Sequence, residues 1–156
     1  MVKLGGLQRF STIDFPRKLS AVVFTVGCNF RCPFCHNPDL VLGKGDEISE
    51  NSVLSFLRSR IGQLEGVVIS GGEPTLYADL PAFIARIKSL GFRVKLDSNG
   101  TAPNMLSQLI NDQLLDFVAM DIKHIWGKYH EATNVSIVEE NLKKSVQIIM
   151  SSGVDY

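Results

Sequence analysis

Three cysteines lie within eight residues of one another, and the chain has no other cysteine. Cys28, Cys32 and Cys35 have the spacing Cys-x3-Cys-x2-Cys and directly follow an apolar segment. A loop of this length can curl and present its thiolates to one centre. Iron–sulfur clusters normally take four cysteines, so three leave one iron of a [4Fe–4S] cluster open to another molecule. The spacing therefore predicts a cluster with a vacant position.

Two other interpretations of the cysteines stay open at this point. A structural zinc site would need His36 as its fourth ligand, but His36 directly follows Cys35, whereas structural zinc favours paired ligands with a few residues between them. Three unliganded thiols could also be crowded by chance. A disulfide framework is disfavoured because the cysteine count is odd and the chain starts without an export signal.

Composition limits the partners of this chain. Its 16 basic and 16 acidic side chains cancel, so it has little long-range attraction for phosphate backbones or anionic lipid. No apolar run approaches the ~20 residues of a membrane span, and the start lacks the apolar core of a signal peptide. We therefore expect a cytoplasmic protein of one domain over residues 1–156, with no nucleic acid and no membrane as partners.

Strand and helix patterns alternate along the chain after a polar lead-in over 1–18, which we expect to be loop-like. Buried strands are predicted at 19–26, 66–70, 92–100 and 114–123. Helices are predicted at 48–62, 78–91, 103–112 and 136–153, with Ser49 as an N-cap and a capping box starting at Ser136. This alternation predicts an α/β fold with a parallel sheet, either a barrel or a doubly wound sheet.

Each predicted strand ends in polar or glycine-rich residues: 27–37, 71–74, 97–100 and 121–123. The carboxyl ends of parallel strands meet at one edge, where ligands bind, so these four segments predict one composite site. Paired glycines would let backbone approach a ligand closely, and a carboxylate complements a cation. Considered alone, the same segments are ordinary tight turns, an Asn-Gly turn and solvated carboxylates.

The cysteine segment "CNFRCPFC" resembles the CxxxCxxC signature of radical S-adenosylmethionine (SAM) enzymes. Its surroundings are similar to the activating proteins of anaerobic ribonucleotide reductase, with pyruvate formate-lyase activating enzymes as the next relatives. The resemblance covers nearly the whole chain and implies a partial (β/α) barrel, commonly of six strands. A fifth strand would begin only at 154–156, so a naturally short activator and a chain truncated after the fourth βα unit both stay open.

The resemblance implies that the cysteines hold a [4Fe–4S] cluster whose open iron binds SAM. Reductive cleavage of SAM would then create a glycyl radical on anaerobic ribonucleotide reductase, with flavodoxin or ferredoxin as electron donor. No catalytic side chain beyond the cluster and SAM is implied, because the substrate hydrogen leaves as an atom. The alternatives are activation of a pyruvate formate-lyase-type partner, radical chemistry on a small molecule, and a metal-binding module without turnover.

The resemblance also implies a set of cofactor contacts: Phe34, Gly71, Gly72, Glu73, Asp97, Asn99, Asp121 and Lys123. Phe34 would lie near adenine, Glu73 would receive the SAM ammonium, and Lys123 would approach the SAM carboxylate. Asp97 and Asp121 would help to bind a monovalent cation, since two neighbouring carboxylates need a cation or Lys123 between them.

Two further segments carry expectations of their own. The aromatic and polar stretch of His124, Trp126, Tyr129 and His130 either lines the mouth of the site, contacts a partner or packs as an ordinary loop. Arg17 stands where the family has a glycine, which puts the local turn in question.

Overall fold

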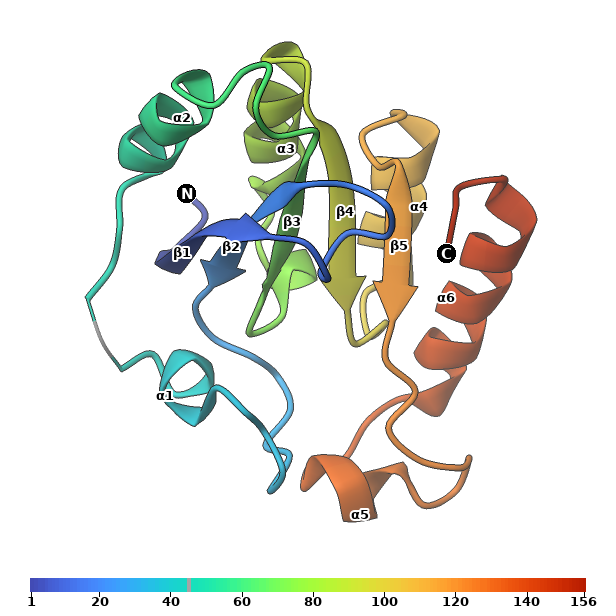
Figure 1. The fold of residues 1–156 in the computed structure, drawn as a ribbon. Coiled ribbons are helices and arrows are strands. Elements are labelled where there is room, and N and C mark those ends of the chain that lie inside the picture. The colour runs from blue at the N-terminus through green and yellow to red at the C-terminus, as the bar shows by residue number, and fades with distance from the viewer. Residues whose placement is uncertain (45) are drawn as a thin grey trace.

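A computed structural model of the chain describes residues 1–44 and 46–156, and it contains one five-stranded sheet in the order β1-β2-β3-β4-β5 (Figure 1). Four strands run parallel, in the order predicted: β2 (Ser20–Thr25), β3 (Gly66–Gly71), β4 (Arg93–Ser98) and β5 (Phe117–Met120). The predicted α/β fold with a parallel sheet is therefore confirmed.

The first strand, β1 (Leu4–Ser11), was not predicted, and the expectation of a loop-like lead-in over 1–18 was wrong. β1 pairs antiparallel with β2 at the edge of the sheet. Its middle residues are exposed or half-buried, and only its terminal residues Leu4 and Ser11 are buried. An edge strand with so little buried surface needs no continuous apolar run, so its sequence resembles a loop.

Helices follow the strands near the predicted positions: α2 (Glu50–Arg58), α3 (Leu80–Ser89), α4 (Pro103–Asn111) and α6 (Glu139–Ser152). Ser49 caps α2 as predicted, because its Oγ accepts the Ser52 N–H at 3.1 Å. The capping box at Ser136 was wrong: α6 begins at Glu139 after Val138, without a side-chain cap. The Glu139 carboxylate instead accepts the Gly127 N–H at 2.8 and 2.9 Å.

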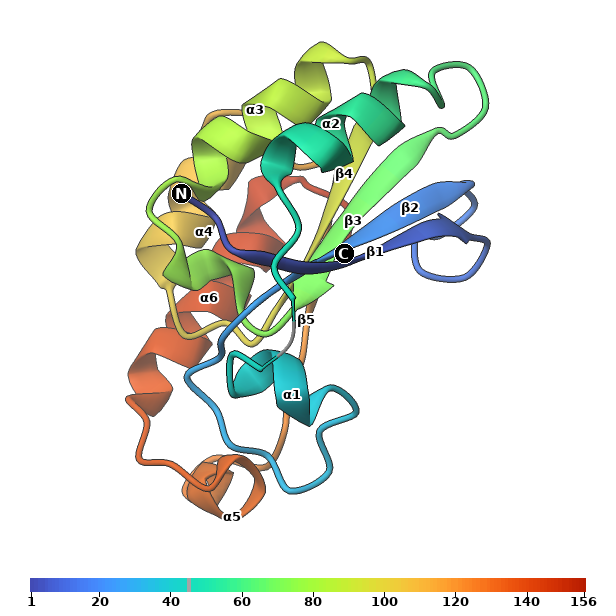
Figure 2. The ribbon, with the colours of Figure 1, turned by 90° about the vertical axis from the view of Figure 1, so that its left-hand side faces the viewer.

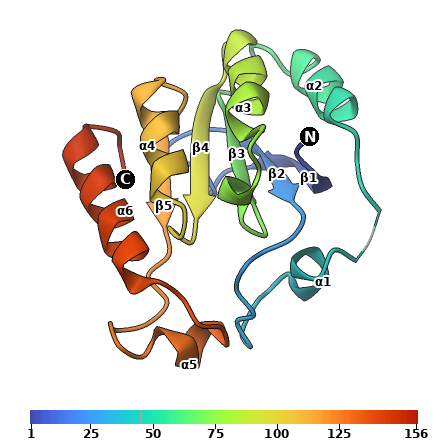
Figure 3. The same ribbon diagram turned by 180° about the vertical axis from the view of Figure 1, so that it is seen from behind.

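Three short helical segments were not predicted: α1 (Pro38–Val41), a 3-10 turn (Pro74–Leu76) and α5 (Tyr129–Thr133). Their segments are too short to show a helical periodicity in the sequence. All three follow the carboxyl ends of strands (Figures 1 and 3). They therefore border the edge of the sheet at which the ligand site was predicted.

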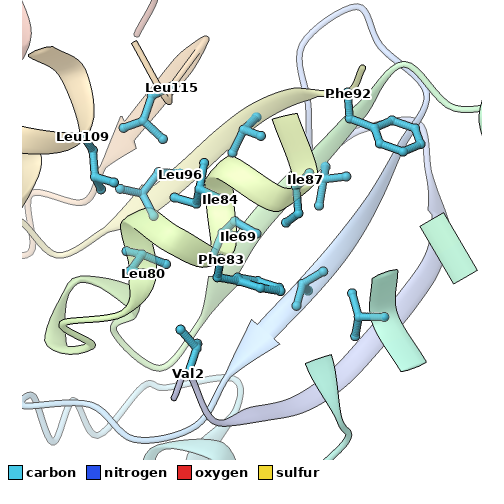
Figure 4. Close-up of a cluster of buried hydrophobic side chains, with 14 of the residues drawn as sticks. Val2, Ile69, Leu80, Phe83, Ile84, Ile87, Phe92, Leu96, Leu109 and Leu115 are labelled. Carbon is cyan, nitrogen blue, oxygen red and sulfur yellow. The ribbon is translucent and has the colours of Figure 1, made fainter. Parts of the chain in front are cut away.

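Both faces of the central strands β2, β3 and β4 are largely buried. The main core lies between the sheet and the helices, and Ile69, Leu96 and Phe83 meet there with no exposed surface (Figures 2 and 4). On the opposite, inner face, Phe15 from the β1–β2 loop packs against Val22 and Val68. Burial on both faces explains why the parallel strands appear in the sequence as continuous apolar runs.

The predicted fifth parallel strand at the C-terminus is present as a single bridge. Asp155 pairs parallel with Phe117, and its carbonyl accepts the Val118 N–H at 2.8 Å. Within residues 1–44 and 46–156, no helix combines the length and the apolar character required to cross a bilayer.

Candidate functional site

A cavity of about 500 Å³ lies at the carboxyl ends of the parallel strands. All eleven residues predicted as cluster ligands or cofactor contacts line it: Cys28, Cys32, Phe34, Cys35, Gly71, Gly72, Glu73, Asp97, Asn99, Asp121 and Lys123. The structure therefore brings together residues that are spread over 96 positions of the sequence. Their individual contacts with a cofactor stay predictions, and the contacts within the protein define what each can do.

The glycine pair at the end of β3 is required by a close approach between two backbones. A Cβ added at Gly72 would lie 1.8 Å from the Gly27 carbonyl oxygen, and one at Gly71 would lie 2.4 Å from the Thr25 nitrogen. Two hydrogen bonds use this approach: Gly72 N–H donates to Thr25 O at 2.9 Å and Glu73 N–H to Gly27 O at 2.8 Å. The glycines thus fix the start of the cysteine loop, a role that the sequence did not indicate.

Glu73 is buried, with 1% of its surface exposed, and its carboxylate accepts four hydrogen bonds. The donors are Thr75 N–H and Oγ1, Ser98 Oγ at 2.9 Å and Asn99 N–H at 2.6 Å. Burial raises the pKa of Glu73, and these hydrogen bonds only partly oppose that shift. Glu73 therefore connects the end of β3 to the end of β4. Sequence reasoning missed its partners Thr75 and Ser98.

The three thiols are free and half-buried in the same cavity. Burial raises the pKa of Cys28 and of Cys32, and the nearby Lys123 ammonium partly opposes the shift at Cys32. Phe30 N–H approaches Cys28 Sγ at 3.4 Å, so a backbone donor already faces this sulfur.

The donor set fits a cluster better than a single metal ion. Among the residues that the structure describes, no group of three or more His, Cys, Asp or Glu side chains could hold one ion. Zinc would require four ligands at about 2.0–2.3 Å from one point. A [4Fe–4S] cluster takes each thiolate on a different iron, so its cysteines stand farther apart. His36 lines the cavity but does not complete a zinc site with the cysteines.

Asn99 joins the end of β4 to the cysteine loop. Its Nδ2 donates to Asn29 Oδ1 at 2.8 Å, and Asn29 Nδ2 in turn donates to Thr101 Oγ1 at 2.8 Å. Asn99 Nδ2 also lies 3.9 Å from Cys28 Sγ. The Asn-Gly turn expected from the sequence therefore has an additional role, because the side-chain amide of Asn99 holds the loop that carries Cys28.

Lys123 provides a cation on the β5 side of the cavity. Its Nζ lies 2.8 Å from Asp121 Oδ2 and 5.9 Å from the centre of the Phe34 ring. Burial disfavours the charged ammonium, but the hydrogen bond and the negative charge of Asp121 outweigh burial and raise the pKa of Lys123. Lys123 therefore remains positively charged at neutral pH and can face an anionic group of a ligand.

The short helix α5 holds the β5 side of the cavity against the cysteine loop. Tyr129 has no exposed surface, and its hydroxyl accepts the Lys123 backbone N–H at 2.9 Å. Its ring packs edge-on against Phe30, with 6.3 Å between ring centres. At the other end of α5, Thr133 O accepts the Arg31 N–H at 2.8 Å. Tyr129 is thus an interior residue that fixes the position of Lys123.

The model of the Radical SAM superfamily matches residues 22–156. The chain belongs to the radical SAM superfamily. Members of this superfamily bind a [4Fe–4S] cluster and SAM, which agrees with three cysteines in a cavity lined by four strand ends.

Two related proteins are named as activating enzymes. MJ1227 of Methanocaldococcus jannaschii, named a glycyl-radical enzyme activating enzyme, is 39% identical over 144 residues, which are 92% of this chain and 59% of that protein. The pyruvate formate-lyase-activating enzyme of Listeria monocytogenes is 33% identical over 141 residues, which are 82% of this chain and 56% of that protein. The radical SAM chain described here therefore spans less than two thirds of the length of either relative.

Solved structures support the fold. QueE from Escherichia coli has a TM-score of 0.52 at 16% identity and is matched over 99% of this chain and 80% of its own. TYW1 with a bound lysine-pyruvate adduct has a TM-score of 0.54 at 16% identity, over 83% of this chain and 50% of its own. At such identities the likeness concerns the fold alone.

Proposed function

We propose that this radical SAM chain is an activase that creates a glycyl radical on an anaerobic ribonucleotide reductase. The observation that carries the proposal is a cavity in which three thiols, without a fourth cysteine, face the Lys123 ammonium and the Gly71–Glu73 backbone. A relative named as a glycyl-radical enzyme activating enzyme supports the type of substrate. Residues 1–156 would form one radical SAM domain acting in the reducing cytoplasm.

The cofactors would supply the chemistry: with one external electron, SAM bound at the cluster gives methionine and a 5′-deoxyadenosyl radical, which takes a hydrogen atom from a glycine Cα. Cys28, Cys32 and Cys35 would hold the cluster. Lys123 would face the SAM carboxylate, and Phe34, above the Lys123 ammonium, would contact the adenine. No side chain has to move a proton, because the glycine loses a hydrogen atom.

Glu73 would act on the SAM ammonium through its charge, and the Glu73 side chain would keep its conformation when SAM binds. Three of its four protein donors reach Oε1 and the Asn99 N–H reaches Oε2, so both carboxylate oxygens are held by the protein. The side chain is therefore fixed in the cavity wall. A low-potential flavodoxin or ferredoxin is the proposed electron donor.

The test is anaerobic incubation of the reconstituted protein with SAM, a reductant and purified anaerobic ribonucleotide reductase. We expect 5′-deoxyadenosine in chromatography and a glycyl-radical doublet in electron paramagnetic resonance of the reductase. The Cys32→Ser variant is expected to yield neither signal. Release of 5′-deoxyadenosine without a doublet on any ribonucleotide reductase would overturn the proposed substrate.

A pyruvate formate-lyase partner is the second candidate, and the 33% identity to a pyruvate formate-lyase-activating enzyme favours it. The same experiment with pyruvate formate-lyase in place of the reductase separates the two. A doublet on the lyase alone would assign this second function. Metal and sulfide analysis that finds zinc without iron or sulfide would instead assign a metal-binding module.

A further inference from the structure

Lys95 is an ammonium in the interior of the protein that the sequence patterns did not single out. It lies in the middle of β4 with 8% of its surface exposed. Its neighbours in register are Val68 on β3 and Phe117 on β5, and both belong to the apolar cluster on the inner face of the sheet. A strand interior between apolar neighbours is an unusual position for a lysine.

The position is stabilised by one ion pair. Side chains two residues apart on a strand point to the same face, so Lys95 and Asp97 are neighbours on the inner face. Lys95 Nζ lies 2.5 Å from Asp97 Oδ1, and no other partner of Lys95 occurs among the hydrogen bonds and ion pairs of the described residues. A buried charge costs several kcal/mol unless it is paired, so this contact fixes both side chains.

Asp97 is the carboxylate at which a free monovalent cation was expected. It lines the cavity, but its charge is already balanced by Lys95, two residues earlier on β4. The charge of Asp121 is balanced by Lys123. No group of three acidic, cysteine or histidine side chains among the described residues could hold a metal ion here. The residues present therefore do not fit a separate cation between Asp97 and Asp121.

We propose that the Lys95 ammonium is a built-in cation that takes the place of a free alkali-metal ion beside Asp97. Lys95 is a positioning residue, since it acts on the cavity through Asp97. Binding of a ligand in the cavity should then be the same with or without K⁺ or Na⁺. The inference rests on the proposed function only in taking SAM as that ligand.

The test compares salts of equal ionic strength that differ in their cation: KCl, NaCl and tetramethylammonium chloride. SAM binding to the anaerobically reconstituted protein is measured by equilibrium dialysis. For the unaltered chain we expect equal dissociation constants in the three salts. For Lys95→Met we expect binding about tenfold weaker in tetramethylammonium, corresponding to about 1.4 kcal/mol, and recovery when K⁺ or Na⁺ can pair with Asp97 in place of the lost ammonium.

Two further variants separate this role from general structural support. Lys95→Arg keeps the charge and should bind SAM equally in all three salts. Lys88→Met also removes a lysine–aspartate pair, with Asp116 at 2.7 Å, but neither residue lines the cavity, so it should bind like the unaltered chain. Tighter binding by the unaltered chain in KCl than in tetramethylammonium, or weak binding by Lys95→Met in every salt, would overturn the inference.

A second measurement keeps the inference separate from the proposed function. The thermal unfolding midpoint of the cluster-free protein needs neither SAM nor a partner protein. Lys95→Met should unfold at a higher temperature in KCl than in tetramethylammonium chloride, and the unaltered chain should not. If no SAM binds in any salt, the proposed function fails, but the unfolding midpoints still test the role of Lys95. Equal midpoints for Lys95→Met in KCl and tetramethylammonium chloride would contradict the inference.

Discussion

The two sides of the cavity are held together by different kinds of contact. On the side of β2 and β3, backbone groups make the closest connections, through Gly72 N–H to Thr25 O and Glu73 N–H to Gly27 O. On the side of β5, side chains hold the residues that line the cavity, through the Tyr129 hydroxyl and the Lys123–Asp121 ion pair, and one backbone hydrogen bond, Arg31 N–H to Thr133 O, joins α5 to the cysteine loop. One cavity therefore has a wall of closely packed backbone and a wall of side chains carried by β5 and α5.

This difference determines how each wall should respond to substitution. Backbones in contact have no rotamers with which to relieve a clash, so a change there displaces the cysteine loop itself. Side chains can repack around a lost hydroxyl or charge, so changes on the β5 side should have graded effects. The following predictions test this comparison, beginning with the largest effect.

Gly72→Ala should have the largest effect. Its Cβ would meet the Gly27 carbonyl oxygen at 1.8 Å, so the start of the cysteine loop has to move. We expect a loss of about 3 kcal/mol or more in the free energy of unfolding, measured with urea, and little bound iron after reconstitution. Gly6→Ala is the control, because its Cβ would meet Phe24 at an ordinary 3.4 Å. Equal stability of the two variants would refute the rigid wall.

Glu73→Gln should lower the free energy of unfolding by about 2 kcal/mol at neutral pH. The reason is that its amide NH2 would face the Asn99 N–H, where the carboxylate now accepts a hydrogen bond. Burial raises the pKa of Glu73 in the folded state. The contribution of this group to stability is therefore fully present below its unfolded pKa of about 4.3, and it is lost as pH rises through the folded pKa. The advantage of the unaltered chain should therefore be greater at pH 5 than at pH 8.

The matched control for this change is Glu65→Gln. Its carboxylate also accepts a backbone N–H, that of Leu19 at 3.2 Å, but on the surface. Urea unfolding at pH 5, 6, 7 and 8 measures both variants. A constant difference between Glu73→Gln and the unaltered chain over this range would contradict the direction of the Glu73 pKa shift.

Tyr129→Phe tests the wall on the β5 side. It should lower the free energy of unfolding by about 1 kcal/mol, since only the hydroxyl that accepts the Lys123 N–H is removed. We expect full iron content but weaker SAM binding, as Lys123 loses a fixed position. Trp126, the only tryptophan, stacks on Tyr129 with 5.7 Å between ring centres, so its fluorescence should change as well. Tyr156→Phe, at an exposed tyrosine, is the control. Loss of the cluster in Tyr129→Phe would show that both walls are equally rigid.

Arg17→Gly should have the smallest effect on stability, and it should raise stability where the other substitutions lower it. Arg17 has φ of 59°, a left-handed conformation that costs a non-glycine residue about 1–2 kcal/mol, and the flexibility of glycine offsets part of this gain. We expect about 0.5 kcal/mol more stability in urea unfolding. Arg17 lies in the loop between β1 and β2, away from the cysteine end of β2, so SAM binding should not change. Altered SAM binding would show that the two ends of the sheet are coupled.

Much of this fold followed from local patterns. The parallel strands were predictable because burial on both faces leaves continuous apolar runs, and the family glycine expected at Arg17 agrees with the left-handed turn found there. The edge strand β1 and the five-residue helix α5 were not predictable, since neither has an apolar pattern of sufficient length. The pairing of Lys95 with Asp97 had a signal that was not used, namely the alternation of side chains along a strand.

The sequence by itself determined which chemical groups reach the site, because the carboxyl ends of parallel strands meet at one edge whatever the details of packing. It did not determine what those groups contact. Only the tertiary structure decided that Glu73 is held by four protein donors, that Gly72 faces the Gly27 carbonyl and that Asp97 is paired with Lys95. Such contacts depend on separations of a few ångströms between segments distant in the sequence, and residue spacing alone does not specify them.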